Sequence, residues 1–363
     1  MVKGLSGEVL LNSPAKLRGR GNSTWLMDKK PYRLKLNKSE SLLGMPSSKT
    51  LVLLANYADK SLLRNELAFE VSRMFEMAFT PQSRYIDLFL NGSCIGNYLL
   101  TASIAEGKDK VDVVPPKMPM NGIGGYLLEV TGYNQNDPII FKTGFDVNIA
   151  IKYPDEKEIT SEQIAYIKSH YQKFENVISV QNVQDMELRY QQLLDVNSII
   201  DFYLINEILA NPDLFWSIYM YKKYDDDKLY TGPIWDFDIA ANNDTNVGDV
   251  VNTLAYNFAL RYATNNWFSR LMTLPSFRSK IKERWNLRKA RIETLPSLVD
   301  QLAVKLKFSQ NQNFQRWDIL EKRVYRELQI GGSYSAETAL LKTFLTKRIA
   351  WLNKEFNSSY YSQ

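Results

Sequence analysis

The stretch that decides the fold is NEILANPDLFWSIYMYKKYDDDKLYTGPIWDFDIA, residues 206–240. It begins inside an apolar run of helical spacing, and Asn211-Pro212 predicts the end of that helix because a residue before proline disfavours helical backbone. Two strand-like runs follow, SIYMYKKY and KLYTGPI, joined by a solvated acidic turn at residues 225–227. The pattern predicts a helix, a loop carrying Asp213, a β-hairpin and then the acidic WDFD segment.

Three carboxylates flank this hairpin. A hairpin returns the chain close to its starting point, so Asp213 and Asp236 are expected to lie near one another. Asp238 stands two residues further on. A hard cation accepts one or two carboxylates plus substrate phosphates, so Asp236 and Asp238 are candidate metal ligands. Asp213 is a candidate catalytic base, with a turn-capping role as the alternative. For Asp236 and Asp238 the alternative is helix capping or ion pairing.

Basic residues upstream of this stretch offer an anion site. In PYRLKL, residues 31–36, alternation puts the apolar side chains on one face of a strand and Arg33 and Lys35 on the other. The glycines of RGRGN, residues 18–22, permit close backbone approach to an anion but serve an ordinary turn equally well. For Lys30, Arg33 and Lys35 the competing interpretation is a basic strand face exposed to water, and for Arg64 it is a surface or ion-paired residue. The candidates are Lys30, Arg33, Lys35, Arg18, Arg20, Asn22 and Arg64.

The rest of the chain predicts an α+β protein. Residues 1–150 contain strand-like runs, a helix from an Asp59 cap to about Glu76, and a hairpin turning at Asn91-Gly92. Residues 151–363 are mainly helical, with amphipathic spacing through most of the last hundred residues.

Composition narrows the chemistry. The 363 residues carry a net charge of +5 with charges interspersed, which gives no strong case for nucleic acid as a partner. One cysteine, Cys94, excludes an internal disulfide framework, and one histidine, His170, excludes histidine-rich metal sites. No apolar run approaches the roughly 20 residues of a membrane span. The start lacks signal-peptide features, and because it falls within an expected strand, a removed export signal is one interpretation.

Standard nucleotide-binding signatures are absent from the sequence. The chain has no G-x-x-x-x-G-K-[ST] phosphate loop and no G-x-G-x-x-G-x-V loop of ordinary protein kinases. The order of helix, loop aspartate, hairpin and Asp-Phe nevertheless resembles the order of parts in protein kinases.

A set of motifs in fixed order resembles the CotH family, named for the spore coat protein H kinase. The motifs are RGRGNSTW (18–25), KKPYRLKL (29–36), LLANYADKSLLRNELAFE (53–70), LFLNGSCIGNYLL (88–100), GGYLLEV (124–130), NEILANPD (206–213) and PIWDFDIA (233–240). The resemblance implies an atypical protein-kinase-like fold of two lobes. These are a β-rich lobe to about residue 150 and a mainly helical lobe from about 151, within one domain of residues 1–363.

The resemblance also implies ATP and Mg²⁺ as cofactors and phosphorylation of Ser or Thr on secreted or cell-envelope proteins. By position, Asp213 matches the catalytic aspartate and Asp236 the metal-binding aspartate, which Asp238 would support. Lys30 matches the nucleotide-binding lysine, and Arg33 or Arg64 would offset phosphate charge. Glu129 or Glu207 would pair with one of these cations.

Three features depart from the family pattern, and one is that TASIAEG follows the YLL run, with no glutamate before Glu106 where many members have one. Ser217 stands where many members have a metal-binding Asn, and Ala241 stands where many have Gly. A serine hydroxyl is a poorer metal ligand than an amide oxygen. Two alternatives therefore stay open, namely an inactive surface-binding or adhesion protein of this family and a metal-dependent glycosyltransferase that uses the DxD motif.

Overall fold

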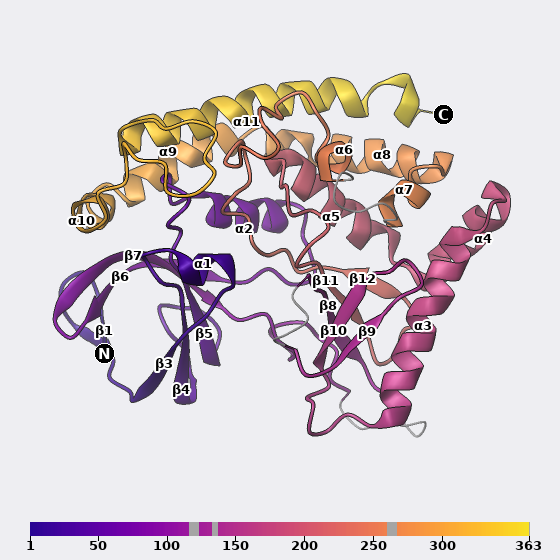
Figure 1. Ribbon diagram of the computed structural model, residues 1–363, viewed down its shortest axis with the longest axis horizontal. Helices are drawn as coiled ribbons and strands as arrows, with labels where there is room; N and C mark the ends of the chain where they lie inside the picture. The colour runs from indigo at the N-terminus through magenta and orange to yellow at the C-terminus, as the bar shows by residue number, and fades with distance from the viewer. Residues whose placement is uncertain (116–122, 133–136, 260–266, 363) are drawn as a thin grey trace.

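The computed structural model describes residues 1–115, 123–132, 137–259 and 267–362. Helices and antiparallel sheets together confirm the predicted α+β class (Figure 1). A short ribbon of β1 (Val2–Lys3) and β2 (Val9–Leu11) starts the chain, and two five-stranded sheets follow. In Figure 1 both sheets lie on the same side of a layer of long helices.

The first sheet holds the basic strand. Its order is β3 (Ala15–Gly19), β4 (Tyr32–Glu40), β5 (Ser48–Leu54), β7 (Ser93–Ala102) and β6 (Ser83–Leu90). On β4, Leu36 is buried whereas Arg33 and Lys35 are exposed, as the alternation predicts. Asn91 and Gly92 form the predicted β6–β7 turn with φ values of 50° and 81°. The short α1 (Ser23–Leu26) joins β3 to β4.

The second sheet combines strands from both halves of the chain. Its order is β12 (Leu229–Thr231), β11 (Tyr219–Lys222), β8 (Tyr126–Val130), β10 (Asn148–Tyr153) and β9 (Ile140–Lys142). The predicted hairpin is β11–β12, and β11 also pairs with β8, placing Tyr219 opposite Glu129. The lobe boundary expected near residue 150 therefore runs through this sheet, because β8 and β9 precede that position, β10 spans it, and β11 and β12 follow it.

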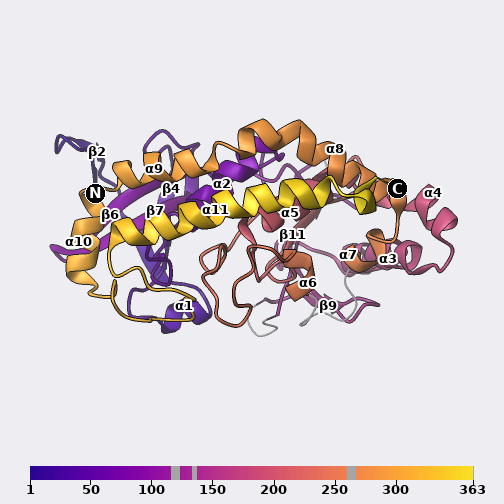
Figure 2. The ribbon, with the colours of Figure 1, turned by 90° about the horizontal axis from the view of Figure 1, so that it is seen from above.

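Helices cover the two sheets. They are α2 (Arg64–Met74), α3 (Ser161–Ser179), α4 (Val183–Leu193), α5 (Val196–Leu209), α6 (Ala255–Ala259), α7 (Trp267–Leu271), α8 (Pro275–Ile292), α9 (Leu295–Lys305), α10 (Ser309–Arg316), α11 (Tyr334–Phe356) and the 3₁₀ turn η1 (Ser359–Tyr361). Figure 2 shows α11 running along this layer. Helix α5 is buried on nearly every face and packs against α2, α8, α11 and β12, as expected of a helix that is apolar all round.

Helix α2 starts later than the sequence predicts. It begins at Arg64, not directly after Asp59, and ends at Met74. Leu62 has a φ of 62°, which cannot belong to a right-handed helix. The Asp59 carboxylate instead accepts hydrogen bonds from the backbone N–H groups of Ser61 (3.0 Å) and Arg64 (2.8 Å). Asp59 thus supports the first turn of α2 from five residues upstream.

No helix in the described part of the chain is long and apolar enough to cross a membrane.

The largest apolar core draws residues from both halves of the chain and is centred on α5. The loop after the C-terminal end of α5 carries the first candidate site residue, Asp213.

Candidate functional site

The Asp213 loop is built at the end of α5. Ala210 ends the helix in the left-handed conformation, with a φ of 45°, and turns the chain out of the helical layer. Asn211 then donates from its side-chain amide to Asn206 Oδ1 (3.0 Å) and accepts from the Asp213 N–H (3.2 Å). These two bonds hold Asp213 on a short turn, partly buried.

The β11–β12 hairpin delivers the second pair of carboxylates. The Gly232 N–H donates to Tyr219 O (2.8 Å) just after β12, and the chain then enters the DFD segment, residues 236–238. Asp236 has a φ of 69°, a left-handed conformation that is uncommon outside glycine and is often found at functional sites. Asp238 is buried, whereas Asp236 stays partly exposed.

The three predicted carboxylates come together. Burial, followed by the charges of Asp236 and Asp244, raises the pKa of Asp213 to about 7. Burial, Asp236 and Asp213 raise the pKa of Asp238 well above its usual range. Burial also raises the pKa of Asp236, whereas the positive charge of Arg20 lowers it. Such mutual repulsion is relieved by a bound cation, so the donor set fits a divalent metal ion.

Asp213, Asp236 and Asp238, called the acidic group below, do not form a complete metal cage. No set of three or more His, Cys, Asp or Glu side chains within the described ranges is arranged to hold a metal ion. Mg²⁺ is commonly bound through one or two carboxylates together with substrate phosphates. The arrangement therefore fits a metal that is shared with a phosphate-bearing ligand.

Three arginines lie close together at the first sheet, and one of them, Arg20, acts on Asp236 of the acidic group. Arg18 on β3 stands directly opposite Arg33 on β4, and Arg20 follows directly after the end of β3. The Arg20 guanidinium lies 5.6 Å from the centre of the Trp235 ring, next to Asp236. Burial, then Arg20 and Arg18, lowers the pKa of Arg33. Like charges opposite one another destabilise a sheet, and an anion placed between them would relieve that cost.

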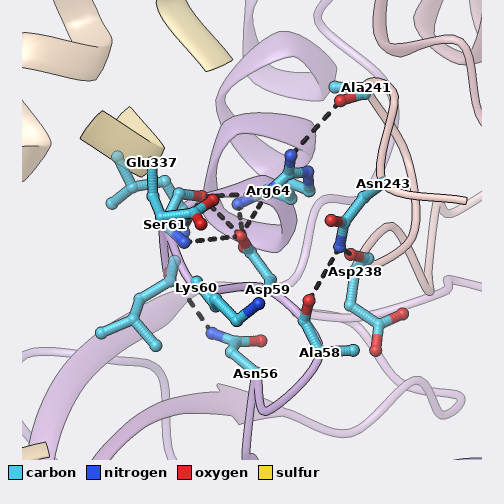
Figure 3. Close-up of polar contacts among 12 residues, drawn as sticks. Asn56, Ala58, Asp59, Lys60, Ser61, Arg64, Asp238, Ala241, Asn243 and Glu337 are labelled. Atoms are coloured by element: carbon cyan, nitrogen blue, oxygen red, sulfur yellow. Dashed lines mark hydrogen bonds and ion pairs between the residues drawn. The ribbon is translucent and has the colours of Figure 1, made fainter. Parts of the chain in front are cut away.

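Arg64 holds the DFD segment from α2. Its Nη1 forms a buried ion pair with Asp59, and its Nε and Nη2 donate to the carbonyl oxygens of Ala240 (2.8 Å) and Ala241 (3.3 Å) (Figure 3). The guanidinium is therefore occupied by protein groups. The structure gives Arg64 a positioning role behind the acidic group, which differs from the direct phosphate contact expected from the sequence.

Two asparagines fix the same segment and were missed by the sequence analysis. Asn65 Oδ1 accepts from the Phe237 N–H (2.9 Å), and the Asn243 side chain donates to Ala58 O (2.9 Å) and Asp238 O (2.8 Å). Asn243 lies in Figure 3 between the Ala58 loop and Asp238. Their roles depend on contacts between segments about 180 residues apart, for which the local sequence carries no signal.

The lysine and asparagine candidates lie around α1. Lys30 Nζ donates to Trp25 O (2.9 Å) and lies 5.5 Å from the centre of the Trp25 ring, partly exposed. Asn22 is the N-cap residue of α1. The neighbouring Lys29 is fully buried and donates to Ala55 O, Asn97 O and Asn313 Oδ1. Of the two adjacent lysines, Lys30 is the one that remains accessible to a ligand.

The two glutamate candidates pair with other cations than those expected. Glu129 pairs with Lys152 (3.1 Å), and it accepts a hydrogen bond from Tyr219, which in turn faces Arg20 and Asp236. Glu207 is fully buried, pairs with Arg348 of α11 (2.9 Å) and accepts from two backbone N–H groups at the start of α6. Glu129 therefore borders the site, whereas Glu207 ties helices together away from it.

The departures Ser217 and Ala241 share one backbone feature. Their φ values are 53° and 52°, so both residues adopt the left-handed conformation that favours glycine or asparagine. Ser217 lies in the loop after Asp213, and Ala241 follows the DFD segment.

Comparison with known proteins agrees with this geometry. No curated protein gave a significant match. The profile of the family described as CotH kinase protein matches residues 17–352. This span includes Arg18, Arg20 and Arg33, the Asp213 loop, the DFD segment and most of α11. The chain therefore belongs to the CotH kinase family.

Proposed function

We propose that this chain is an ATP- and Mg²⁺-dependent protein kinase that transfers the γ-phosphoryl group to Ser or Thr of secreted or cell-envelope proteins. The observation that carries the proposal is the meeting of Asp213, Asp236 and Asp238, with Arg20 beside Asp236. Membership of the CotH kinase family supports kinase chemistry in general. Phosphoryl transfer requires mainly positioning and charge neutralisation, which suits such a site.

Asp213 has the properties of a general base. Its carboxylate is partly buried, and a pKa near 7 matches the requirement that a base be deprotonated yet still able to take up a proton close to neutral pH. In the proposal Asp213 orients the acceptor hydroxyl and accepts its proton.

Asp236 and Asp238 would hold the Mg²⁺, which when bound neutralises charge on the phosphates. Arg18, Arg20 and Arg33 would face the polyphosphate from the first sheet, and Lys30 would add a further cation from the α1 side. The proposal thus treats residues 1–363 as one domain of two kinase-like lobes, with the nucleotide between the arginine strands and the Asp213 loop.

Thermal-shift titration with ATP, with and without Mg²⁺, tests nucleotide binding, and phosphorylation of dephosphorylated casein followed by mass spectrometry tests transfer. We expect Asp236→Asn to lose Mg²⁺-dependent ATP binding. Asp213→Asn is expected to keep that binding and to lose transfer by about a hundredfold or more. Asp225→Asn, an exposed acid in the same hairpin, is the matched control and should behave like the wild type.

Two outcomes would contradict the proposal. Stabilisation by sugar nucleotides but not by ATP would favour a glycosyltransferase. No shift with either ligand at millimolar concentration would favour a binding protein without catalytic activity.

A further inference from the structure

The loop between α10 and α11 brings an arginine to the acidic group. The Thr245 N–H donates to Arg326 O (2.6 Å), and Arg326 Nη1 lies 3.8 Å from Asp244 Oδ2. Thr245 and Asp244 follow closely after the DFD segment. Arg326 is thereby placed next to the residues that line the site, although it lies 113 positions beyond Asp213 in the sequence.

Buried ionic contacts fix the backbone on both sides of Arg326. The Glu327 carboxylate accepts from the Val324 N–H (3.2 Å) and the Tyr325 N–H (2.9 Å), and it pairs with Lys60 at 2.9 Å. Lys60 and Glu327 are both almost completely buried. An ion pair of this kind is costly to break, so the loop has one well-defined position.

The same anchor holds the DFD segment. Lys60 follows Ala58 and Asp59, the residues that contact Asn243 and Arg64 (Figure 3). The loop preceding α2 therefore sets the relative positions of Arg326 and Asp238. Such shared support is expected where two groups must act on one ligand.

The Arg326 guanidinium is only loosely held by the protein. Its side chain remains 45% exposed, and at 3.8 Å the contact with Asp244 is long for a charged hydrogen bond. Arg64, in contrast, is completely occupied by protein groups. Arg326 thus keeps donor capacity for an anion.

Different cations act on different carboxylates of the acidic group. Arg20 is the cation that acts on Asp236, and Arg326 is the cation that acts on Asp213. Asp213 is the group proposed to contact the acceptor hydroxyl. A cation on that side lies where negative charge moves during transfer.

We propose that Arg326 is a further catalytic residue, which contacts the phosphoryl group in transit on the acceptor side of the site. This inference rests on the proposed kinase function. In the step, the acceptor oxygen forms a bond to the γ-phosphorus while the bond from that phosphorus to the β–γ bridging oxygen breaks. The hydroxyl proton passes to Asp213, ADP leaves, and Arg326 donates hydrogen bonds to the phosphoryl oxygens throughout.

The test compares Arg326→Gln with wild type using two measurements. With dephosphorylated casein and saturating ATP, kcat is expected to fall by about 10²–10³-fold, the usual cost of removing one charge-stabilising donor. The KM for ATP should stay within about twofold. In calorimetry, ADP with Mg²⁺ and aluminium fluoride, which mimics the transferring phosphoryl group, should bind the variant at least about tenfold more weakly, while ATP binding is unchanged.

Three further variants separate catalysis from structure. Arg326→Lys keeps the charge and should retain more activity than Arg326→Gln. Arg323→Gln removes an exposed arginine from the same loop and should behave like wild type. Asp244→Asn removes the acidic partner of Arg326, so it reproduces the Arg326→Gln defect only if that ion pair is what matters.

Three results would overturn the inference. The first is a kcat of Arg326→Gln within twofold of wild type, and the second is equal defects in Arg326→Gln and Asp244→Asn. The third is a loss of activity that parallels a loss of thermal stability. Absence of phosphate transfer by the wild type would instead overturn the proposed function, and the inference with it.

Discussion

At the residue scale, the acidic group shows which features local sequence can predict. Asp213, Asp236 and Asp238 were identifiable because a hairpin closes on itself and needs no information from elsewhere in the chain. The partners of Arg64 and Glu207 were not, because Ala240 and Arg348 lie 176 and 141 positions away. A charged residue in a helical pattern has the same appearance whether it meets solvent, a ligand or a buried partner.

The raised pKa of Asp213 makes a prediction about pH. Asp213 must be deprotonated to act as a base, and burial with two neighbouring carboxylates moves its pKa from 3.8 to about 7. Phosphate transfer at limiting acceptor should therefore increase as the pH rises, with its midpoint below 7 when Mg²⁺ is bound, because the cation offsets the Asp236 charge. Asp244→Asn removes one of the charges that raise this pKa, so it should move the rise toward lower pH. The measurement is kcat/KM for casein between pH 5 and 9, and a flat profile for both proteins would contradict this role for Asp213.

At the element scale, the DFD segment depends on α2 and the loop before it. The predicted helix was correct in existence but began four residues too early, because Asp59 has the sequence signature of an N-cap while the structure uses it to hold Arg64. The turn after the DFD segment is likewise set by contact with α2, because Arg64 donates hydrogen bonds to the carbonyl oxygens of Ala240 and Ala241.

Adjacent alanines in this turn test its backbone conformation. Ala241 has a φ of 52°, a backbone conformation that costs a residue with a side chain about 1–2 kcal/mol. Glycine at this position avoids that cost, but it loses a similar amount through the greater entropy of the unfolded chain and the lost burial of a methyl group. Ala241→Gly should leave the free energy of unfolding within about 0.5 kcal/mol of wild type. Ala240→Gly is the matched control, without a left-handed φ, and should cost about 1–2 kcal/mol. Equal destabilisation of the two variants in urea titration would show that the turn is not strained at Ala241.

At the scale of the whole molecule, the pairing of distant segments was the part that sequence could not supply. The strand-like pattern of GGYLLEV predicted β8, but its pairing with β11 joins residues about 90 positions apart. No periodicity encodes such a partner, because any half-buried strand presents the same backbone hydrogen bonds. The division into two lobes near residue 150 stays a prediction, although this sheet takes strands from both sides of that position.

Lys29 and Lys30 provide the last prediction, because one of these adjacent lysines is buried and the other is partly exposed. Lys29 connects the first sheet to α10 through Ala55 O, Asn97 O and Asn313 Oδ1, whereas the Lys30 ammonium donates to Trp25 O and lies over the Trp25 ring. Lys29→Met leaves buried acceptors without a donor and should lower the free energy of unfolding by at least about 2 kcal/mol.

Lys30→Met should change the free energy of unfolding by less than about 0.5 kcal/mol, because its side chain is partly exposed. If Lys30 contacts a phosphate, the same substitution should weaken Mg²⁺-dependent ATP binding by about tenfold or more, the loss expected for one charge-assisted contact. Chemical denaturation and calorimetry on both variants measure the two effects separately. ATP affinity that survives Lys30→Met but disappears in a stably folded Lys29→Met would reverse the two roles, since the buried lysine would then have to leave its acceptors in order to reach the nucleotide.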